Sequence, residues 1–169
     1  ALGTEFIMVP SIPGDLREGA DNWKRLADLF NAQSAKAAEQ GMKLGYHNHA
    51  FEFAPADGPE GTLLDVFLKN TEPRVLMQID TGNALHGGAD PVAFIRNYPG
   101  RYESVHLKEF DPDNDKALIG EGKVDWPGVF EASESVGGVK WYVVEQESYA
   151  HPPLECVDRC LKALRKMGK

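Results

Sequence analysis

The chain has little cysteine, no long hydrophobic run and no excess of positive charge. Cys156 and Cys160 are the two cysteines and lie one helical turn apart, so we expect no disulfide between them and a cytoplasmic location. No stretch approaches the roughly 20 apolar residues of a membrane span, and no basic-then-apolar leader opens the sequence. The formal net charge of −8 argues against non-specific binding of nucleic acid, which depends on a basic surface. We therefore expect neither a membrane nor a nucleic acid as a partner.

What is present is typical of one globular domain. Hydrophobic residues make up 42% of the 169 residues and charged residues 26%, and this length is sufficient to bury a core. Short β-rich runs alternate with helical patterns, and this alternation predicts an α/β fold with a parallel sheet and outer helices. The predicted strands cover residues 5–10, 43–48, 74–80, 102–108 and 140–147, and the predicted helices cover 21–41, 62–70, 90–98, 125–135 and 153–166.

Three local features refine this pattern. Asp21 is the expected N-cap of the first helix. The last helix is predicted to carry an apolar face, formed by Leu154, Val157, Leu161 and Leu164. The segment 109–124 is long, polar and glycine-bearing, which makes it a candidate active-site loop, and its stretch "ALIG" is a candidate for one more short strand.

Four of the predicted strands end in metal-binding or acid–base side chains. They carry His47, Asp80, His106 and Glu145, in that order along the chain. Because the C-terminal ends of parallel strands converge on one mouth, we expect these four side chains to meet there. Two imidazoles and two carboxylates suit Mn, Fe, Co or Zn, with positions left open for a substrate. Each residue alone is better explained as a hydrogen-bonded core group or a loop anchor, and the series of four favours a site.

Four segments together resemble the sugar phosphate isomerase/epimerase family with the xylose-isomerase-like TIM barrel. They are "GYHNHAFEF" (45–53), "QIDTGNALHGGADPVAFIRNYPGRYESVHLKEF" (78–110), "IGEGKVDW" (119–126) and "YVVEQE" (142–147). The resemblance implies a divalent ion (Mn, Zn, Co, Fe or Mg) held by His47, Asp80, His106 and Glu145. His47 is a departure, since many members have glutamate there and use two ligating glutamates as opposed proton-transfer groups. Glu52 or Glu147 is a candidate to supply the missing carboxylate, and both are candidate substrate-binding residues.

The resemblance begins at the third strand of that barrel, and "ALGTEFIMVP" (1–10) corresponds to this strand and the tail of the preceding helix. A complete barrel of this kind needs about 250 residues. We therefore expect a partial (β/α) barrel over 1–169 that lacks the first two β/α units and has about five or six strands. Its open edges would expose unpaired backbone, which favours a homo-oligomer or a fragment of a longer chain.

The activity that the resemblance implies is isomerisation or epimerisation of a small sugar or polyol. Glu145 would abstract a proton next to a carbonyl, with its pKa raised by a dry mouth, while the ion stabilises the enediolate. Lys108 would neutralise the developing oxyanion, or pair with Glu109 or Glu121 at the rim in a purely structural role. Asn83 and His49 would orient substrate hydroxyls, although His49 is equally well explained as a loop anchor.

Three alternatives stay open at this point. An inosose dehydratase or a 3-keto-glycoside lyase of the same superfamily shares the metal and the enolate chemistry but ejects a leaving group. A non-catalytic fragment or assembly module would keep the ligands without a closed pocket. A nuclease is disfavoured, because Asn83 stands where the endonuclease relatives have a histidine and because the chain is acidic.

Overall fold

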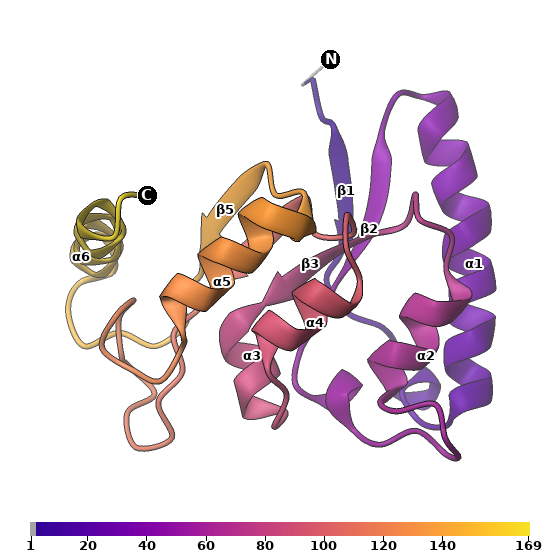
Figure 1. Cartoon of the computed structure of the whole chain (residues 1–169), viewed down its shortest axis with the longest axis horizontal. Coiled ribbons are helices and arrows are strands. Elements are labelled where there is room, and N and C mark those ends of the chain that lie inside the picture. Colours follow the sequence, from indigo (N-terminus) through magenta and orange to yellow (C-terminus); the bar gives the residue numbers. More distant parts are fainter. Residues whose placement is uncertain (1–2) are drawn as a thin grey trace.

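Residues 3–169 are described by a computed structural model, in which five parallel strands pair in chain order (Figure 1). The strands are β1 (Phe6–Val9), β2 (Lys43–His47), β3 (Leu76–Asp80), β4 (Ser104–Leu107) and β5 (Trp141–Val144). The helices are α1 (Ala20–Glu39), α2 (Leu63–Asn70), α3 (Thr81–His86), α4 (Pro91–Asn97), α5 (Trp126–Ala132) and α6 (Pro153–Lys166). This arrangement is a partial TIM barrel with five strands, and it confirms the predicted fold class. Ala1 and Leu2, assigned above to the tail of a preceding helix, lie outside the described residues.

The two faces of the sheet have different contents. Tyr46 and Ile79 are buried on the face covered by helices, and Tyr46 contacts aromatic rings from α1 and α2. Successive side chains of a strand point to opposite faces, so His47 and Asp80 lie on the inner face. The parallel register pairs Asp80 with His106, which brings these two inner residues to the same height.

An aromatic cluster joins α1 and α2 to β2. Trp23 and Phe30 from α1 meet Tyr46 and Phe67 in edge-to-face or tilted contacts, with ring centroids 5.0–6.1 Å apart. All four side chains are buried. Such pairs add about 0.5–1.5 kcal/mol each beyond the burial of their area. The cluster therefore holds the C-terminal end of β2 against α1 and α2.

Helix caps explain most of the helix boundaries. Thr62 and Asp65 form a capping box at α2, and Asp90 caps α4, whose first residue is Pro91. The expected cap of α1 is wrong, because its N-cap is Gly19 with a φ of 77° and Asp21 lies in the first turn.

Three other expectations differ from the structure. The short helix α3 was not predicted; it follows β3 directly because Asp80 accepts a hydrogen bond from the backbone N–H of Asn83 at 2.7 Å. The stretch "ALIG" (117–120) forms turns and no strand, since its backbone bonds within its own loop. The strands are also shorter than predicted, so that Glu145 lies one residue beyond β5.

Helix α6 stands apart from the other helices, beyond the loop that follows β4 (Figure 1). Its buried residues are Cys156, Cys160 and Leu164, whereas Leu154 is 87% exposed and Val157 47% exposed. The predicted apolar stripe therefore exists, but most of it faces outward in this chain. No helix within residues 3–169 combines the length and the hydrophobicity that a membrane crossing requires.

Candidate metal centre and adjoining pocket

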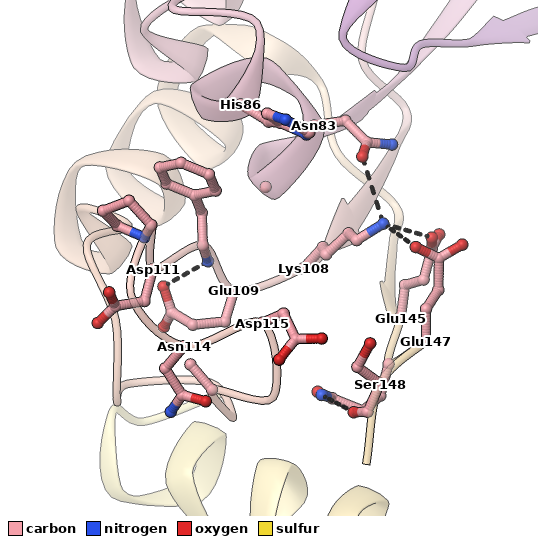
Figure 2. Close-up of a pocket in the computed structure, with 15 residues that line it drawn as sticks. Asn83, His86, Lys108, Glu109, Asp111, Asn114, Asp115, Glu145, Glu147 and Ser148 are labelled. Atoms are coloured by element: carbon pink, nitrogen blue, oxygen red, sulfur yellow. Dashed lines mark hydrogen bonds and ion pairs between the residues drawn. The ribbon is translucent and has the colours of Figure 1, made fainter. Parts of the chain in front are cut away.

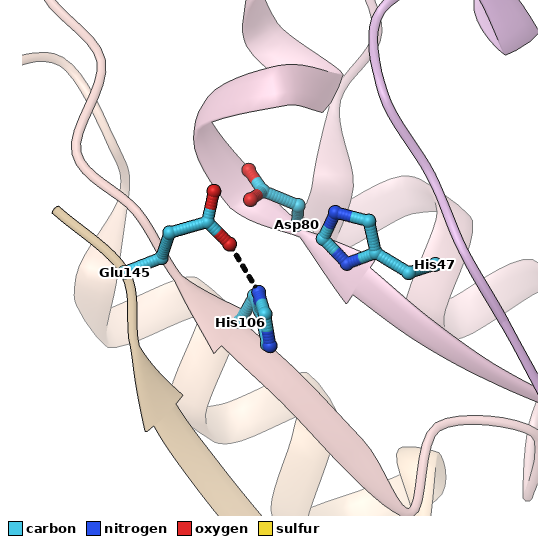
Figure 3. Close-up of side chains that lie close together, drawn as sticks. All are labelled: His47, Asp80, His106 and Glu145. Atoms are coloured by element: carbon cyan, nitrogen blue, oxygen red, sulfur yellow. Dashed lines mark hydrogen bonds and ion pairs between the residues drawn. The ribbon is translucent and has the colours of Figure 1, made fainter. Parts of the chain in front are cut away.

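Four side chains predicted to meet do meet at the C-terminal edge of the sheet (Figure 3). They are His47 at the end of β2, Asp80 at the end of β3, His106 in β4 and Glu145 just after β5. Each offers one possible ligand atom, and these atoms all lie within 4.8 Å of one another. Four donors bonded to one ion at roughly 2.0–2.2 Å lie about 3.4 Å apart in a tetrahedral site, so the four side chains could share an ion after small movements.

Two atoms of this cluster are buried without a hydrogen-bond partner among the described residues. They are Nδ1 of His47 and Oδ2 of Asp80. Burial lowers the pKa of His47 to about 4, with a further contribution from His106, and burial raises the pKa of Asp80 to about 7. An orphaned acceptor in the interior costs roughly 1–3 kcal/mol, so the donor set fits a bound cation better than an empty cavity.

The carboxylate of Glu145 has a different environment from the one expected. Its Oε2 is hydrogen-bonded to Nδ1 of His106, and its Oε1 accepts from Lys108 Nζ at 3.2 Å. The hydrogen bond with His106 is the main cause that lowers the pKa of Glu145 to about 2, against the opposing effect of burial. The prediction of a raised pKa for this carboxyl is therefore wrong for the metal-free chain.

Lys108 contacts the cluster through Glu145. Its ammonium donates to Oδ1 of Asn83 at 3.2 Å and pairs with both Glu145 and Glu147. Burial acts to lower the pKa of Lys108, but the hydrogen bond to Glu147 and the nearby carboxylates raise it overall. The structural alternative for Lys108, a pairing with Glu109 or Glu121, is not what the structure has.

A pocket of about 480 Å³ adjoins the cluster on the Lys108 side (Figure 2). Its walls come from α3, from the loop after β4 and from residues 145–148. Asn83, Lys108, Glu145 and Glu147 all line it, as expected for substrate-contacting residues. The volume lies within the range of roughly 300–1,000 Å³ that is typical of small-molecule sites.

Two of the predicted substrate-binding residues do not line this pocket. Glu52 is fully buried, where its carboxylate accepts from the hydroxyl of Tyr46 at 2.6 Å and from the backbone N–H of His49 at 2.9 Å. The substrate-binding role of Glu52 is therefore corrected to an anchor of the loop after β2. The ring of His49 lies beside that of His47, with centroids 5.2 Å apart, and does not line the pocket.

The sequence reasoning missed two polar residues that support the site. The side chain of Asn48 is buried; its Oδ1 accepts from the backbone N–H of Asp80 at 3.0 Å. The hydroxyl of Thr81 donates to the carbonyl of Lys108 at 2.7 Å. Both stand in the quoted motifs "YHNH" and "DTGN", directly after predicted ligands, which is the signal that points to them.

Known proteins match both the sequence and the fold. The family described as xylose isomerase-like TIM barrel matches residues 1–167. Two curated relatives named inosose dehydratase come from Klebsiella pneumoniae subsp. pneumoniae and Clostridium botulinum. The first is 30% identical over 75% of this chain and 48% of its own length, and the second is 26% identical over 85% and 54%.

A crystal structure from Parabacteroides distasonis, titled a sugar phosphate isomerase/epimerase, matches with a TM-score of 0.84 and 29% identity. The match covers 97% of this chain and 58% of that one. The chain thus spans about half the length of the curated relatives that it matches.

Proposed function

The chain belongs to the family of xylose isomerase-like TIM barrels, and we propose that it carries the metal centre of an enzyme acting on a small sugar or polyol. The proposed reaction is an isomerisation or epimerisation that begins with abstraction of a proton next to a carbonyl. The observation that carries the proposal is the meeting of His47, Asp80, His106 and Glu145 beside a pocket of substrate size. A divalent ion held by these residues would polarise the carbonyl and so acidify the neighbouring C–H bond.

The residues around the pocket have distinct proposed roles. Glu145 is ionised at neutral pH, because the pKa of its carboxyl is lowered to about 2, and it is our proposed proton acceptor. A carboxylate of low pKa is a weak base, so it requires a substrate C–H that is already acidified. Lys108 is a cation at the same mouth and would stabilise negative charge on a substrate oxygen. Asn83 and Glu147 would hold substrate hydroxyls from the pocket walls. His49 would hold one from its place beside His47.

A dehydration is the second candidate, and the names of the inosose dehydratase relatives favour it. Loss of water from the carbon next to an enolate needs the same metal and the same base. It also needs an acid for the departing hydroxyl, and we propose the ammonium of Lys108, which lines the pocket, for that role. The two candidates therefore share every residue named above and differ in the fate of the enolate.

Exchange of substrate hydrogen with deuterated water tests both candidates at their shared step. The protein is incubated with Mn²⁺ and a panel of neutral ketoses and one inosose, and proton NMR follows deuterium at the carbon next to the carbonyl. We expect exchange with at least one compound, loss of exchange in Glu145→Gln and a smaller effect in Glu147→Gln. Products that keep the composition of the substrate, apart from the incorporated deuterium, indicate isomerisation, and products that have lost water indicate dehydration. Absence of both exchange and Mn²⁺ uptake would leave the non-catalytic alternative.

We also propose that residues 1–169 form one barrel domain that further strands complete. Among the described residues, β1 and β5 are the outer strands of the sheet and each pairs with one neighbour. Trp141 and Val143 of β5 have exposed apolar side chains, as do Leu154 and Val157 of α6. Unpaired strand edges with apolar flanks are sites of strand addition, from a second copy or from a longer form of the chain.

A further inference from the structure

Glu109, which directly follows Lys108, makes an unusual number of hydrogen bonds for one buried carboxylate. Glu109 is buried, with 9% of its surface exposed. Oε1 accepts from the backbone N–H groups of Phe110 at 2.9 Å and Val124 at 3.1 Å. Oε2 accepts from the backbone N–H of Gly120 at 2.7 Å and from the indole N–H of Trp126 at 2.8 Å.

The four donors come from both ends of the loop 110–124 and from the first residue of α5. Hydrogen bonds to an ionised acceptor are roughly twice as strong as neutral ones. We propose that Glu109 is a positioning residue that clamps the loop 110–124 into the wall of the pocket beside the metal centre. This proposal rests on the proposed function only in that the pocket receives the substrate.

Two glycines make room for the clamp. A Cβ on Gly122 would lie 2.5 Å from the carbonyl oxygen of Phe110 and 2.7 Å from Oε1 of Glu109. A Cβ on Gly82 of α3 would lie 2.7 Å from the carbonyl oxygen of Glu109. All three distances are shorter than van der Waals contact allows. The segment 119–126 therefore closes around the carboxylate, and α3 packs against the backbone of Glu109. A side chain on Gly122 would displace the carboxylate, and one on Gly82 would displace the backbone of Glu109.

The clamp acts on groups that face the pocket. Phe110, the first residue of the loop, stacks on the ring of His86 with centroids 6.1 Å apart and 22° between planes, and both line the pocket. Asp111 and Asp115, farther along the loop, line it as well (Figure 2). Lys108 points from the other side of the same backbone toward Glu145. Glu109 thus links the loop wall to the lysine at the mouth.

Glu109→Gln is the test variant, and Glu121→Gln is the matched control in the same loop. Glutamine keeps the size of the side chain but removes its charge. It also replaces one acceptor oxygen by an amide N–H₂ that faces N–H donors and cannot accept from them. The carboxylate of Glu121 accepts from the backbone N–H of Leu118 at 3.0 Å and makes none of the clamp contacts. Hydrogen–deuterium exchange should rise about tenfold or more in peptides covering 110–124 of Glu109→Gln, as expected from loss of charge-assisted bonds. The strands β3 and β4 should be unchanged, and Glu121→Gln should affect at most the turn around Leu118.

A spectroscopic signal in the pocket separates positioning from general stability. Release of the loop moves Phe110 away from His86, so the ring C–H resonance of His86, assigned with His86→Gln, should shift in Glu109→Gln. The ring resonances of His47 and His106 should stay in place. A folded Glu109→Gln with unchanged loop exchange and an unchanged His86 resonance would overturn the proposal.

Trp126→Phe removes one of the four donors and is the second test variant, for use if Glu109→Gln does not fold. It should loosen the same loop to a smaller extent, and an unaffected loop there would equally overturn the proposal. Where the wild-type protein turns over an inosose, KM should rise more than kcat falls in Glu109→Gln. Absence of turnover in the wild type would count against the proposed function alone, because the exchange and NMR results do not depend on it.

Discussion

Replacing Asp80 by asparagine separates two roles of one side chain. Oδ1 of Asp80 caps α3 through the backbone N–H of Asn83, while Oδ2 is buried without a partner among the described residues. Asparagine keeps a capping oxygen and removes the charge, so the variant should fold with α3 in place. It loses the carboxylate that the proposed metal centre needs.

The structure gives the size of the effect in metal-free protein. Burial raises the pKa of Asp80 from 3.8 to about 7, which corresponds to about 4 kcal/mol at about 1.4 kcal/mol per pKa unit. A carboxyl whose folded pKa is raised contributes stability below its unfolded pKa, and this contribution is lost as the pH rises through the folded pKa. The new amide N–H₂ stands where Oδ2 lacks a partner and costs about 1–3 kcal/mol. Above about pH 7, Asp80→Asn should therefore be more stable than the wild type by about 1–3 kcal/mol.

Urea unfolding followed by circular dichroism, with a chelator and then with Mn²⁺, measures both roles. With Mn²⁺ at about 100 times its Kd the wild type should gain about 2.7 kcal/mol, and Asp80→Asn should gain nothing. The control is Asp125→Asn, the same change at the N-cap of α5 outside the cluster. Equal stabilisation of wild type and Asp80→Asn by Mn²⁺, or a less stable Asp80→Asn in the chelator above about pH 7, would refute the reasoning.

Three further changes have outcomes that follow from the structure. Burial is the main cause that raises the pKa of Glu52 above its usual 4.5, so the wild type should lose stability relative to Glu52→Gln as the pH rises above 4.5; a pH-independent difference in urea unfolding would contradict this. Trp23→Ala should lower the free energy of unfolding by about 3–5 kcal/mol, since it empties the centre of the aromatic cluster, and a loss under about 1 kcal/mol would argue against that packing. Leu154→Glu combined with Val157→Glu should lower the mean mass measured by light scattering at high concentration, and an unchanged mass would mean that α6 makes no contact between copies.

The meeting of the four candidate ligands was predictable, because a parallel sheet brings residues at the ends of successive strands together. His47, Asp80 and His106 each stand at a strand end after an apolar run, and parallel pairing in chain order brings such ends to one edge. The outcome for Glu145 differs, because its protonation depends on whether His106 or an ion contacts it. Side-chain contacts across strands are absent from any local pattern, and for this reason the pKa of its carboxyl was predicted in the wrong direction.

Local rules likewise predicted most of the helices, with α3 missed, but not which residues cover them. The sequence defined α6 to its end residues, yet Leu154 is exposed and Cys156 is buried, since burial depends on which neighbours are present. Glu52 and Glu109 are both carboxylates beside aromatic residues in predicted loops. The tertiary structure decided that the first anchors a loop in the interior and that the second gathers four donors from segments up to 17 residues away. Neighbouring residues determine the periodicity and the order of the strands. Hydrogen-bond partners and solvent access are determined only when distant segments pack together.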